Sequence, residues 1–250
     1  TYESFRMYYE TLEAKRFQVT LELTRRELSD KSGVVTDKIN NFFKFQAAAM
    51  DRLSFAKMIS NPTGVDAVSM FNASHPHASS AGGVQSNYST NPLTLANFET
   101  CRKGMMGYTN DKDELINSSL TIIRVGPSRI RQAKDLFGAQ RVIAVDSTGA
   151  EATSSTVDAT TIQNAYAGEV LVIEEPRLTG TYQYYWFCQD GNAPAKPMIL
   201  IKVEDMKVVT QIDESSPERF TADRYLWSIE ATLIFAPYNS LAMYGNYATS

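Results

Sequence analysis

The sequence contains little of what enzymes, membrane proteins and secreted scaffolds depend on. Its 250 residues include only two cysteines and two histidines. No apolar run approaches the roughly 18–20 residues that span a bilayer, so we expect no membrane partner. The cysteines, Cys101 and Cys188, lie far apart and follow no ligand or redox spacing, which favours reduced thiols over a disulfide scaffold.

Basic residues are also too few for a dedicated nucleic-acid binder. The net charge is −4, whereas proteins that bind polyanionic phosphate normally carry a basic excess. The 43% hydrophobic and 21% charged residues are typical of a globular protein with a sizeable core. The chain starts at Thr1 and has no signal-peptide pattern, so we expect a soluble intracellular protein whose sequence is processed, truncated or renumbered at its N-terminus.

What the sequence does have is clear periodicity, first in a strand near its start. Four apolar residues alternate with four polar ones: Phe17, Val19, Leu21 and Leu23 against Gln18, Thr20, Glu22 and Thr24. This period of two predicts a half-buried strand. Phe5, Met7 and Tyr9 alternate too, so we expect a two-stranded ribbon that turns near residues 11–14. Because an isolated ribbon is only marginally stable, it should lie on another element.

A long amphipathic helix is predicted next, from Thr36 to Ser60. Thr36 is a suitable N-cap, Asp37 favours the positive end of the helix dipole, and Pro62 follows the end. Its apolar stripe recurs at helical spacing and comprises Ile39, Phe42, Phe43, Gln46, Ala49, Met50, Leu53 and Ala56. Such a helix would be a rod of roughly 35–40 Å that forms the long axis of its domain.

The rest of the chain is predicted to be mixed and finally rich in strands. We expect a Ser- and Gly-rich loop over 72–92, a helix over 95–108 capped by Thr94, a strand over 120–125, a helix over 128–137 capped by Ser128, and an exposed excursion over 148–161. Five further strands are expected at 170–173, 184–187, 198–203, 207–212 and 226–235. Helices early and strands late predict an α+β architecture.

Both histidines of the chain fall in the 72–92 loop, as His75-Pro-His77. A zinc site needs three or four ligands, and neither Asp66 nor Cys101 stands at a recognisable ligand spacing from the pair. With Ser and Gly downstream, we expect both rings on an exposed loop. We therefore assign no metal, cofactor-binding or catalytic residue.

The other possible motifs are incomplete. There is no Gly-x-Ser-x-Gly elbow, the acidic run 110–114 lacks the Gly and Glu of a calcium loop, and the turn at Gly126 lacks the Gly-Lys-Ser/Thr of a phosphate loop. A local basic cluster comprises Arg124, Arg129, Arg131, Lys134 and Arg141. We interpret it as a solvated helix face, or as a set of contacts to acidic residues of a neighbouring subunit. The sequence thus predicts no enzyme and no cofactor.

Four stretches occur in a distinctive order along nearly the whole chain. The first two are 16–30 (RFQVTLELTRRELSD) and the loop 71–76 (FNASHP) with Gly82-Gly83 and Ser86-Asn87 after it. The third is the strand–Pro–helix unit 120–136 with 169–178 (EVLVIEEPRL), and the fourth is Lys196-Pro197 with Asp213-Glu214, Phe220, Asp223 and Tyr225-Leu-Trp227. Together they resemble the Mu-like major head (major capsid) proteins of tailed phages.

This resemblance implies the Hong Kong 97-type capsid fold. Residues 1–33 would form an extended β-ribbon, the E-loop, across a neighbouring subunit. Residues 34–92 would supply the spine helix of the peripheral domain and the following loop. Residues 93–202 would form a mixed β/α axial domain, and residues 203–250 the strands that return to the peripheral domain and the C-terminus. The FNASHP loop would then connect parts of a shell subunit.

The implied function is assembly. Copies of the chain would form pentamers and hexamers through contacts that close, and these rings would tile an icosahedral shell around double-stranded DNA. Overlapping ribbons would multiply modest contacts through avidity, and the acidic total would keep contact with packaged DNA weak and non-specific. Portal, scaffold, maturation protease and decoration proteins would be further partners. The protein would reside in the virion after assembly in the host cytoplasm.

Two other readings of the sequence stay open. An encapsulin-like nanocompartment shell would share the fold and hold cargo protein instead of DNA, and the particle of a gene-transfer agent or defective prophage is a further shell variant. A small metal-dependent enzyme that uses His75 and His77 ranks lower. Replacing both histidines separates these classes, because a shell protein would still assemble and an enzyme would lose its metal.

Overall fold

The chain divides into two compact units, each of which is described by itself. The computed structural model describes residues 13–30, 32–64, 66–76, 84–110, 113–138, 141–143, 161–211 and 223–249. Unit 1 comprises Thr1–Pro62 and Met198–Pro237, and unit 2 comprises Thr63–Pro197 and Tyr238–Ser250. No helix of the described ranges is long and apolar enough to cross a membrane.

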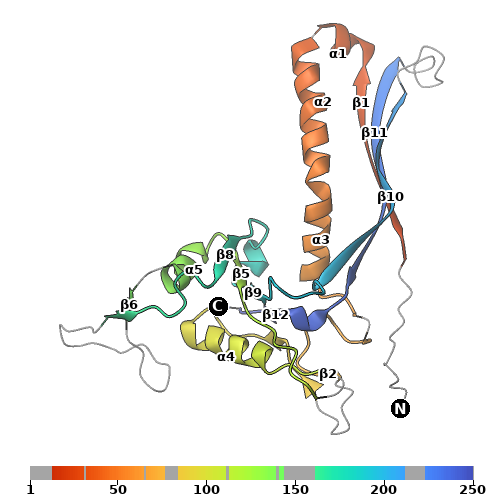
Figure 1. Cartoon of the computed structure of the whole chain (residues 1–250). Helices are drawn as coiled ribbons and strands as arrows, with labels where there is room; N and C mark the ends of the chain where they lie inside the picture. The colour runs from red at the N-terminus through yellow and green to blue at the C-terminus, as the bar shows by residue number, and fades with distance from the viewer. Residues whose placement is uncertain are drawn as a thin grey trace, which may run out of the picture. The chain divides into compact units, whose positions relative to one another are not determined.

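Unit 1 is a helical rod on one three-stranded antiparallel sheet (Figure 1). The strand order is β1 (Lys15–Thr24), β11 (Arg224–Pro237) and β10 (Met198–Gln211), so the long central strand comes from near the end of the chain. The short helix α1 (Arg25–Asp30) follows β1, and α2 (Ser32–Ala47) and α3 (Ala49–Ile59) form the rod.

The predicted alternation of β1 is confirmed at three of its four apolar positions: Leu23 is buried, and Phe17 and Leu21 are half-buried. Val19, predicted on the same face, is 43% exposed, and the polar residues of the alternation are exposed as expected. β1 pairs along its whole length with β11, from Lys15 opposite Leu233 to Thr24 opposite Arg224. The predicted upstream strand at residues 5–9 lies outside the described residues.

The long helix starts earlier than predicted, at Ser32, so Thr36 is not its N-cap. Val35 is only 6% exposed, and this burial favours a helical turn that local propensity did not indicate. The backbone ladder continues from α2 to α3, because Ala48 N–H donates to Lys44 O at 3.3 Å and Arg52 N–H donates to Ala48 O at 3.1 Å.

The predicted apolar stripe of the rod is only half-buried. Its described members Ile39, Phe42, Phe43, Ala49, Met50 and Leu53 have intermediate exposure, and Ala56 is exposed. Phe55 and Met58, which were not part of the predicted stripe, are buried. The side chain of Gln46 lies outside the described set.

Unit 2 is built on a mixed five-stranded sheet with the order β4, β12, β9, β5 and β8. Its strands are β4 (Tyr88–Ser89), β12 (Met243–Asn246), β9 (Trp186–Gln189), β5 (Ile122–Val125) and β8 (Leu171–Glu174). Smaller elements are the pairs β2 (His75–Pro76) with β3 (Val84–Gln85) and β6 (Arg141–Ile143) with β7 (Thr161–Gln163), and the turns η1 (Gly180–Tyr182) and η2 (Ser240–Ala242).

Two helices, α4 (Leu95–Met106) and α5 (Ile130–Phe137), supply much of the core of unit 2. Phe98 of α4 is 0% exposed, and its ring centroid lies 4.5 Å from that of Phe137 in α5 and 5.2 Å from that of Tyr166. Trp186 and Ile123 of the sheet join the same core. Aromatic pairs at these distances add stabilisation beyond their burial.

The structure confirms one predicted helix cap and corrects another. Thr94 accepts a hydrogen bond from the Asn97 N–H at 3.2 Å, as a helix N-cap does. Ser128 instead donates to the Gln183 carbonyl at 3.0 Å, and α5 begins two residues later. The Ser128 hydroxyl therefore forms a tertiary hydrogen bond and does not cap this helix.

The late strands also differ in extent from the prediction. The strands expected at 198–203 and 207–212 are one strand, β10, with irregular register between Lys202 and Lys207. Pairing along β11 keeps the chain extended across this irregularity. Residues 144–160, which include most of the predicted excursion, lie outside the described ranges.

Candidate functional site

His75 is buried, which corrects the expected exposed loop. It is 4% exposed, its Nδ1 lies 2.5 Å from Asp66 Oδ2, and its Nε2 lies 3.0 Å from Asn87 Oδ1. The pairing of β2 with β3 places His75 opposite Gln85 and holds the ring inside unit 2. His77 lies outside the described residues.

Asn87 joins this histidine to three backbone groups on two segments of the chain. Its Nδ2 donates to Met70 O at 2.7 Å and to Ser240 O at 2.8 Å, and its Oδ1 accepts from the Asn72 N–H at 2.8 Å. Both ring nitrogens of His75 are thus directed at oxygen atoms of the protein. The described residues contain no group of three or more His, Cys, Asp or Glu side chains that could hold a metal ion.

The hydrogen-bond network of Asp66, His75 and Asn87 could be predicted only in part from the sequence. Asp66 stands at no recognisable metal-ligand spacing from the histidines, yet the turn after Gly64 brings its carboxylate to His75. In the sequence Asn87 stands out only as part of the Ser86-Asn87 motif. A buried asparagine that joins distant backbone groups has no spacing signature.

The two cysteines meet in the core although they are distant in sequence. Cys101 in α4 and Cys188 in β9 are 2% and 0% exposed, and Cys101 Sγ donates to Asn246 Oδ1 at 3.4 Å. Burial raises the pKa of the Cys188 thiol, and the neighbouring Cys101 raises it further. A buried, protonated thiol is a poor nucleophile, so this pair has the character of core packing.

The basic residues near α5 do not converge on one point. Arg124 Nε donates to Gln189 Oε1 at 3.3 Å, the Arg129 guanidinium lies 4.7 Å from the ring centroid of Tyr184, and Arg131 is paired with Asp135 at 3.9 Å. The side chain of Arg141 is outside the described set, and Lys134 is exposed. These contacts favour separate local roles over a shared anion site.

The acidic run and the turn at Gly126 form contacts within the protein, as far as the structure describes them. In the acidic run, Asn110 Nδ2 donates to Glu114 Oε2 at 2.9 Å, and both side chains are exposed. At the turn that resembles a phosphate loop, a Cβ on Gly126 would collide with the Leu178 carbonyl. Glycine is needed there because two backbone segments of the protein approach closely.

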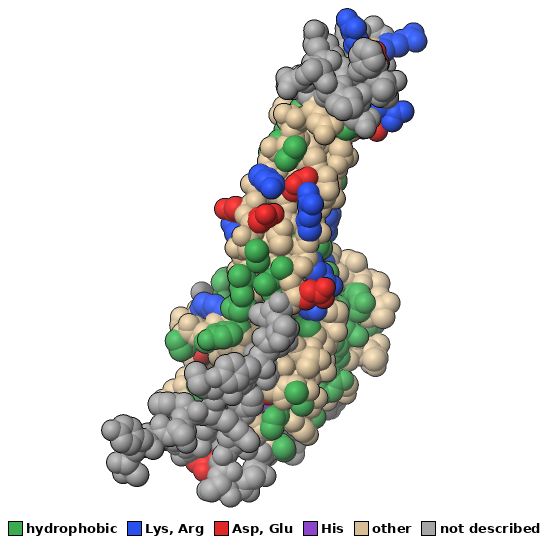
Figure 2. All heavy atoms as spheres, turned by 90° about the vertical axis from the view of Figure 1, so that its right-hand side faces the viewer, with side chains coloured by type: hydrophobic (Ala, Val, Ile, Leu, Met, Phe, Trp, Pro, Cys, Tyr) green, Lys and Arg blue, Asp and Glu red, His purple; other side chains and the backbone are tan. Residues whose placement is uncertain are grey.

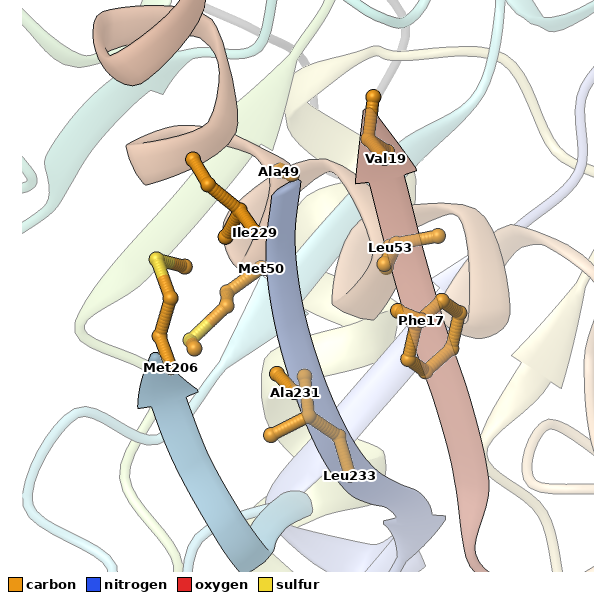
Figure 3. Close-up of a pocket in the computed structure, with 9 residues that line it drawn as sticks. All are labelled: Phe17, Val19, Ala49, Met50, Leu53, Met206, Ile229, Ala231 and Leu233. Carbon is orange, nitrogen blue, oxygen red and sulfur yellow. The ribbon is translucent and has the colours of Figure 1, made fainter. Parts of the chain in front are cut away.

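A small apolar pocket lies between α3 and the sheet of unit 1 (Figure 3). It holds about 30 Å³ and is lined by Phe17, Val19, Ala49, Met50, Leu53, Met206, Ile229, Ala231 and Leu233. Substrate and cofactor pockets are roughly ten times larger and present convergent polar groups. This one is a packing gap in a thin two-layer unit.

The strand β10 carries several exposed apolar side chains. We call it the β10 edge and define it by its exposed residues Leu200, Ile201, Val203, Val208 and Val209. Within the described residues β10 pairs on one side only, with β11. An edge strand with unpaired backbone groups and exposed apolar side chains is a template for association with another chain.

The sheet face that points away from the rod is polar and carries charges of both signs (Figure 2). Glu230 in β11 is 9% exposed, and its Oε2 lies 2.9 Å from Arg16 of β1 and 4.0 Å from Lys207 of β10. One carboxylate therefore joins all three strands. Thr20 and Gln18 complete this face by donating to Ser228 Oγ, each at 3.2 Å.

Comparison with known proteins identifies relatives in structure alone. No protein-family model matches the sequence, and no curated protein sequence matches it. The structure is similar to a chain of Mycobacterium phage Patience with a TM-score of 0.56 and 9% identity, covering 94% of this chain and 70% of that chain. It is similar to a chain of Microbacterium phage Oxtober96 with a TM-score of 0.52 and 12% identity, covering 95% and 73%.

A third similar structure is the capsid of an empty GTA particle. Its TM-score is 0.51 at 11% identity, covering 96% of this chain and 73% of that chain. At such low identity these similarities show the fold alone. The chain has the α+β fold of phage capsid subunits.

Proposed function

We propose that this chain is the major capsid protein of a tailed phage or prophage. Its copies assemble into pentamers and hexamers of an icosahedral shell that encloses double-stranded DNA. The observation that carries the proposal is the capsid fold over 94–96% of the chain. The order of sequence motifs adds the finer assignment to the Mu-like major head family and the Hong Kong 97-type fold.

The surfaces of the two units support a role in assembly over a role in catalysis. Val203 and Val208 of the β10 edge are 56% and 52% exposed, on a strand that pairs on one side only within the described residues. Phe45 of α2 is 69% exposed. Neighbouring subunits would bury such side chains, and many modest contacts of this kind add up through avidity in a closed shell.

The domain assignment is part of the proposal. Residues 1–33 act as the E-loop region, 34–92 as the spine helix and following loop of the peripheral domain, 93–202 as the axial domain, and 203–250 as returning strands and C-terminus. The boundaries between the two compact units differ from these domain bounds and fall after residues 62, 197 and 237. The axial domain therefore begins within unit 2 and ends within β10.

The proposed shell locates the protein in the virion after assembly in the host cytoplasm. Its partners are copies of itself, with portal, scaffold, maturation protease and decoration proteins as further candidates and only weak contact with DNA. An encapsulin-like shell is the second candidate, since it shares the fold. The metal-dependent enzyme is disfavoured because both ring nitrogens of His75 face protein oxygens.

The first test is the particle mass of the purified full chain, by sedimentation and negative-stain imaging. We expect megadalton shells or discrete rings of five and six subunits. A stable monomer under all conditions, including after addition of a coexpressed scaffold, would contradict the proposal. The nucleic-acid content of any shell then separates a DNA container from a compartment for cargo protein.

A second test probes the β10 edge. Val203→Glu places a charge on an exposed strand position, so it should leave the melting temperature nearly unchanged and prevent shell formation. Val203→Thr keeps the branched shape and should still assemble. Shells of normal yield from Val203→Glu would remove the β10 edge from the assembly contacts and leave the capsid function itself intact.

A further inference from the structure

The strand β10 is irregular in its middle. Two register shifts occur between Lys202 and Lys207. From Lys202 to Glu204 the strand takes two steps while β11 takes one, and from Glu204 to Lys207 it takes three steps while β11 takes two. β10 therefore carries two extra residues there, and we call 202–207 the bulged segment. A bulge leaves its extra residue unpaired and bends and twists the strand.

The second shift cancels the effect of the first on the faces of the strand. A shift of one residue moves every later side chain to the opposite face of the sheet, so two shifts restore the alternation. Lys202 and Val208 accordingly stand opposite Leu233 and Ile229, which line the same pocket on the rod side. The lasting effect of the two shifts is therefore on the backbone of β10, at the side that no described strand pairs with.

Polar contacts within the chain hold the bulged segment in place. Lys202 Nζ lies 3.1 Å from Asp205 Oδ1 and closes the segment on itself. The same oxygen accepts a hydrogen bond from the Met206 N–H at 3.1 Å. Glu204 Oε2 accepts another from the Thr232 hydroxyl at 2.9 Å. The carboxylates of the segment thus fix its shape, and one of them occupies a backbone donor.

The stretches on either side of this segment favour strand addition. Residues 198–201 (MILI) and 208–210 (VVT) are rich in β-branched side chains, and Leu200, Ile201, Val208 and Val209 are exposed. An apolar edge of this kind is a template for pairing with another chain and for fibre growth. The charged residues of β10 all lie in the bulged segment between these two stretches.

We propose that the bulged segment prevents a second copy of this chain from adding a strand along β10. An incoming strand needs the outward N–H and C=O groups of every second residue at regular spacing. The segment breaks this spacing, and the Met206 N–H already donates to a carboxylate. Only five regularly paired residues remain on each side, at 198–202 and 207–211.

The block itself does not depend on the proposed capsid function, because it protects a free chain as well as a shell subunit. Its consequence for assembly rests on that function. Copies in a shell would meet the β10 edge through side chains such as that of Val203, which is exposed within the bulged segment, and not through a continuous backbone ladder.

The test removes the two extra residues, Val203 and Asp205, from the full chain. Glu204 and Met206 keep their present faces, and β10 then matches β11 residue by residue. We expect the deletion variant to melt cooperatively and to form fibres that bind thioflavin T, at concentrations where the unchanged protein forms none. A deletion variant that folds and forms no fibres would overturn the proposal.

A further substitution separates strand addition from misfolding. Val208→Lys in the deletion variant places a charge on the open edge without restoring the bulges, and lysine on an edge strand opposes pairing. This change should abolish the fibres. Phe45→Lys adds the same charge at an exposed position of α2 and should leave them unchanged. Fibres that resist Val208→Lys, or that both substitutions abolish, would overturn the proposal.

If the deletion variant does not melt cooperatively, a variant of full length decides. Lys202→Thr with Asp205→Thr opens the contact that closes the bulged segment and frees the Met206 N–H, so it should form fibres. Arg131→Thr with Asp135→Thr removes an exposed pair of the same net charge from α5 and should form none. Equal behaviour of the two double variants would overturn the proposal. Shell formation enters none of these readouts, so a failure of the capsid proposal would not alter them.

Discussion

Unit 2 has a closed hydrophobic core, whereas unit 1 is a thin pair of layers. In unit 2 the side chains of Phe98, Ile123 and Trp186 are 0% exposed. In unit 1 a single rod covers one face of a three-stranded sheet, and most of its apolar stripe stays half-exposed. Among the described large side chains that are at most 2% exposed, only Leu23 and Leu233 belong to unit 1.

This difference shows how the two units depend on their surroundings. Buried apolar area is the main favourable term in folding, so unit 2 has the stronger internal basis for stability. Unit 1 instead leaves the β10 edge open and relies on cross-strand polar contacts around Glu230. In the proposed shell, neighbouring copies supply the burial that unit 1 lacks.

The largest expected effect comes from removing an aromatic ring from unit 2. Phe98→Ala leaves a cavity between Phe137 and Tyr166 and should lower the free energy of unfolding by about 3–5 kcal/mol. Phe45→Ala is the matched control, because Phe45 is 69% exposed and its loss should change stability by less than about 0.5 kcal/mol. Denaturant titration of both variants measures the difference, and equal losses would refute the contrast between the units.

A pair of glycine substitutions should give opposite signs. Gly126→Ala forces a methyl group against the Leu178 carbonyl in unit 2 and should cost about 1–3 kcal/mol. Gly33→Ala meets no atom within 4 Å and lies in the first turn of α2 in unit 1, where alanine should stabilise the helix by up to about 0.5 kcal/mol. Thermal melting of each variant provides the check, and a stable Gly126→Ala protein would contradict the close backbone approach.

The polar face of unit 1 should contribute less. Glu230→Gln removes the charge that joins Arg16 and Lys207 and should lower stability by about 1 kcal/mol, since both cations are more than half exposed. Glu22→Gln affects a pair with Arg224 in which both side chains are 47% exposed, and the loss should stay below about 0.5 kcal/mol. Urea unfolding midpoints at low and high salt distinguish the two variants. An equal loss of stability in both would show that the Glu230 carboxylate has no special role.

The smallest effect is a pH dependence at the end of β1. Thr24 N–H donates to Glu27 Oε2 at 3.0 Å, and the Glu27 N–H donates to Thr24 Oγ1 at 3.3 Å. The hydrogen bond from the Thr24 backbone is the main cause that lowers the pKa of the Glu27 carboxyl. This cap is therefore fully formed above the ordinary pKa of glutamate and is lost as the pH falls through its lowered value.

The amide signal of Thr24 in NMR reports the loss of this cap during acidification. The signal should move with the titration of Glu27, and Glu27→Gln should remove that response. A Thr24 amide that does not respond to acid in the unchanged protein would contradict the reciprocal cap.

Local chemistry made several elements predictable from the sequence. Period-two alternation located β1 and its buried face, and the N-cap preference of threonine located the start of α4 at Thr94. The Thr24-x-x-Glu27 pattern is a capping box that could have located α1 in the same way. These signals lie within a few residues of one another, so no tertiary contact is needed to read them.

Partnerships between distant residues were not predictable in this way. Nine residues separate Asp66 from His75, and Cys101 and Cys188 come from different elements of one core. The start of the long helix depended on the burial of Val35, and the cap expected at Ser128 was lost to Gln183. In each case a tertiary contact outweighed a local preference of about 1 kcal/mol or less.

By itself the sequence determined the α+β class, the faces of β1 and the order of motifs that resembles phage head proteins. Tertiary structure decided that His75 is a buried structural residue and that β10 presents an open apolar edge. The physical reason is that periodicity and caps act between neighbours along the chain. Burial and the pairing of polar groups instead depend on which distant segments the fold brings together.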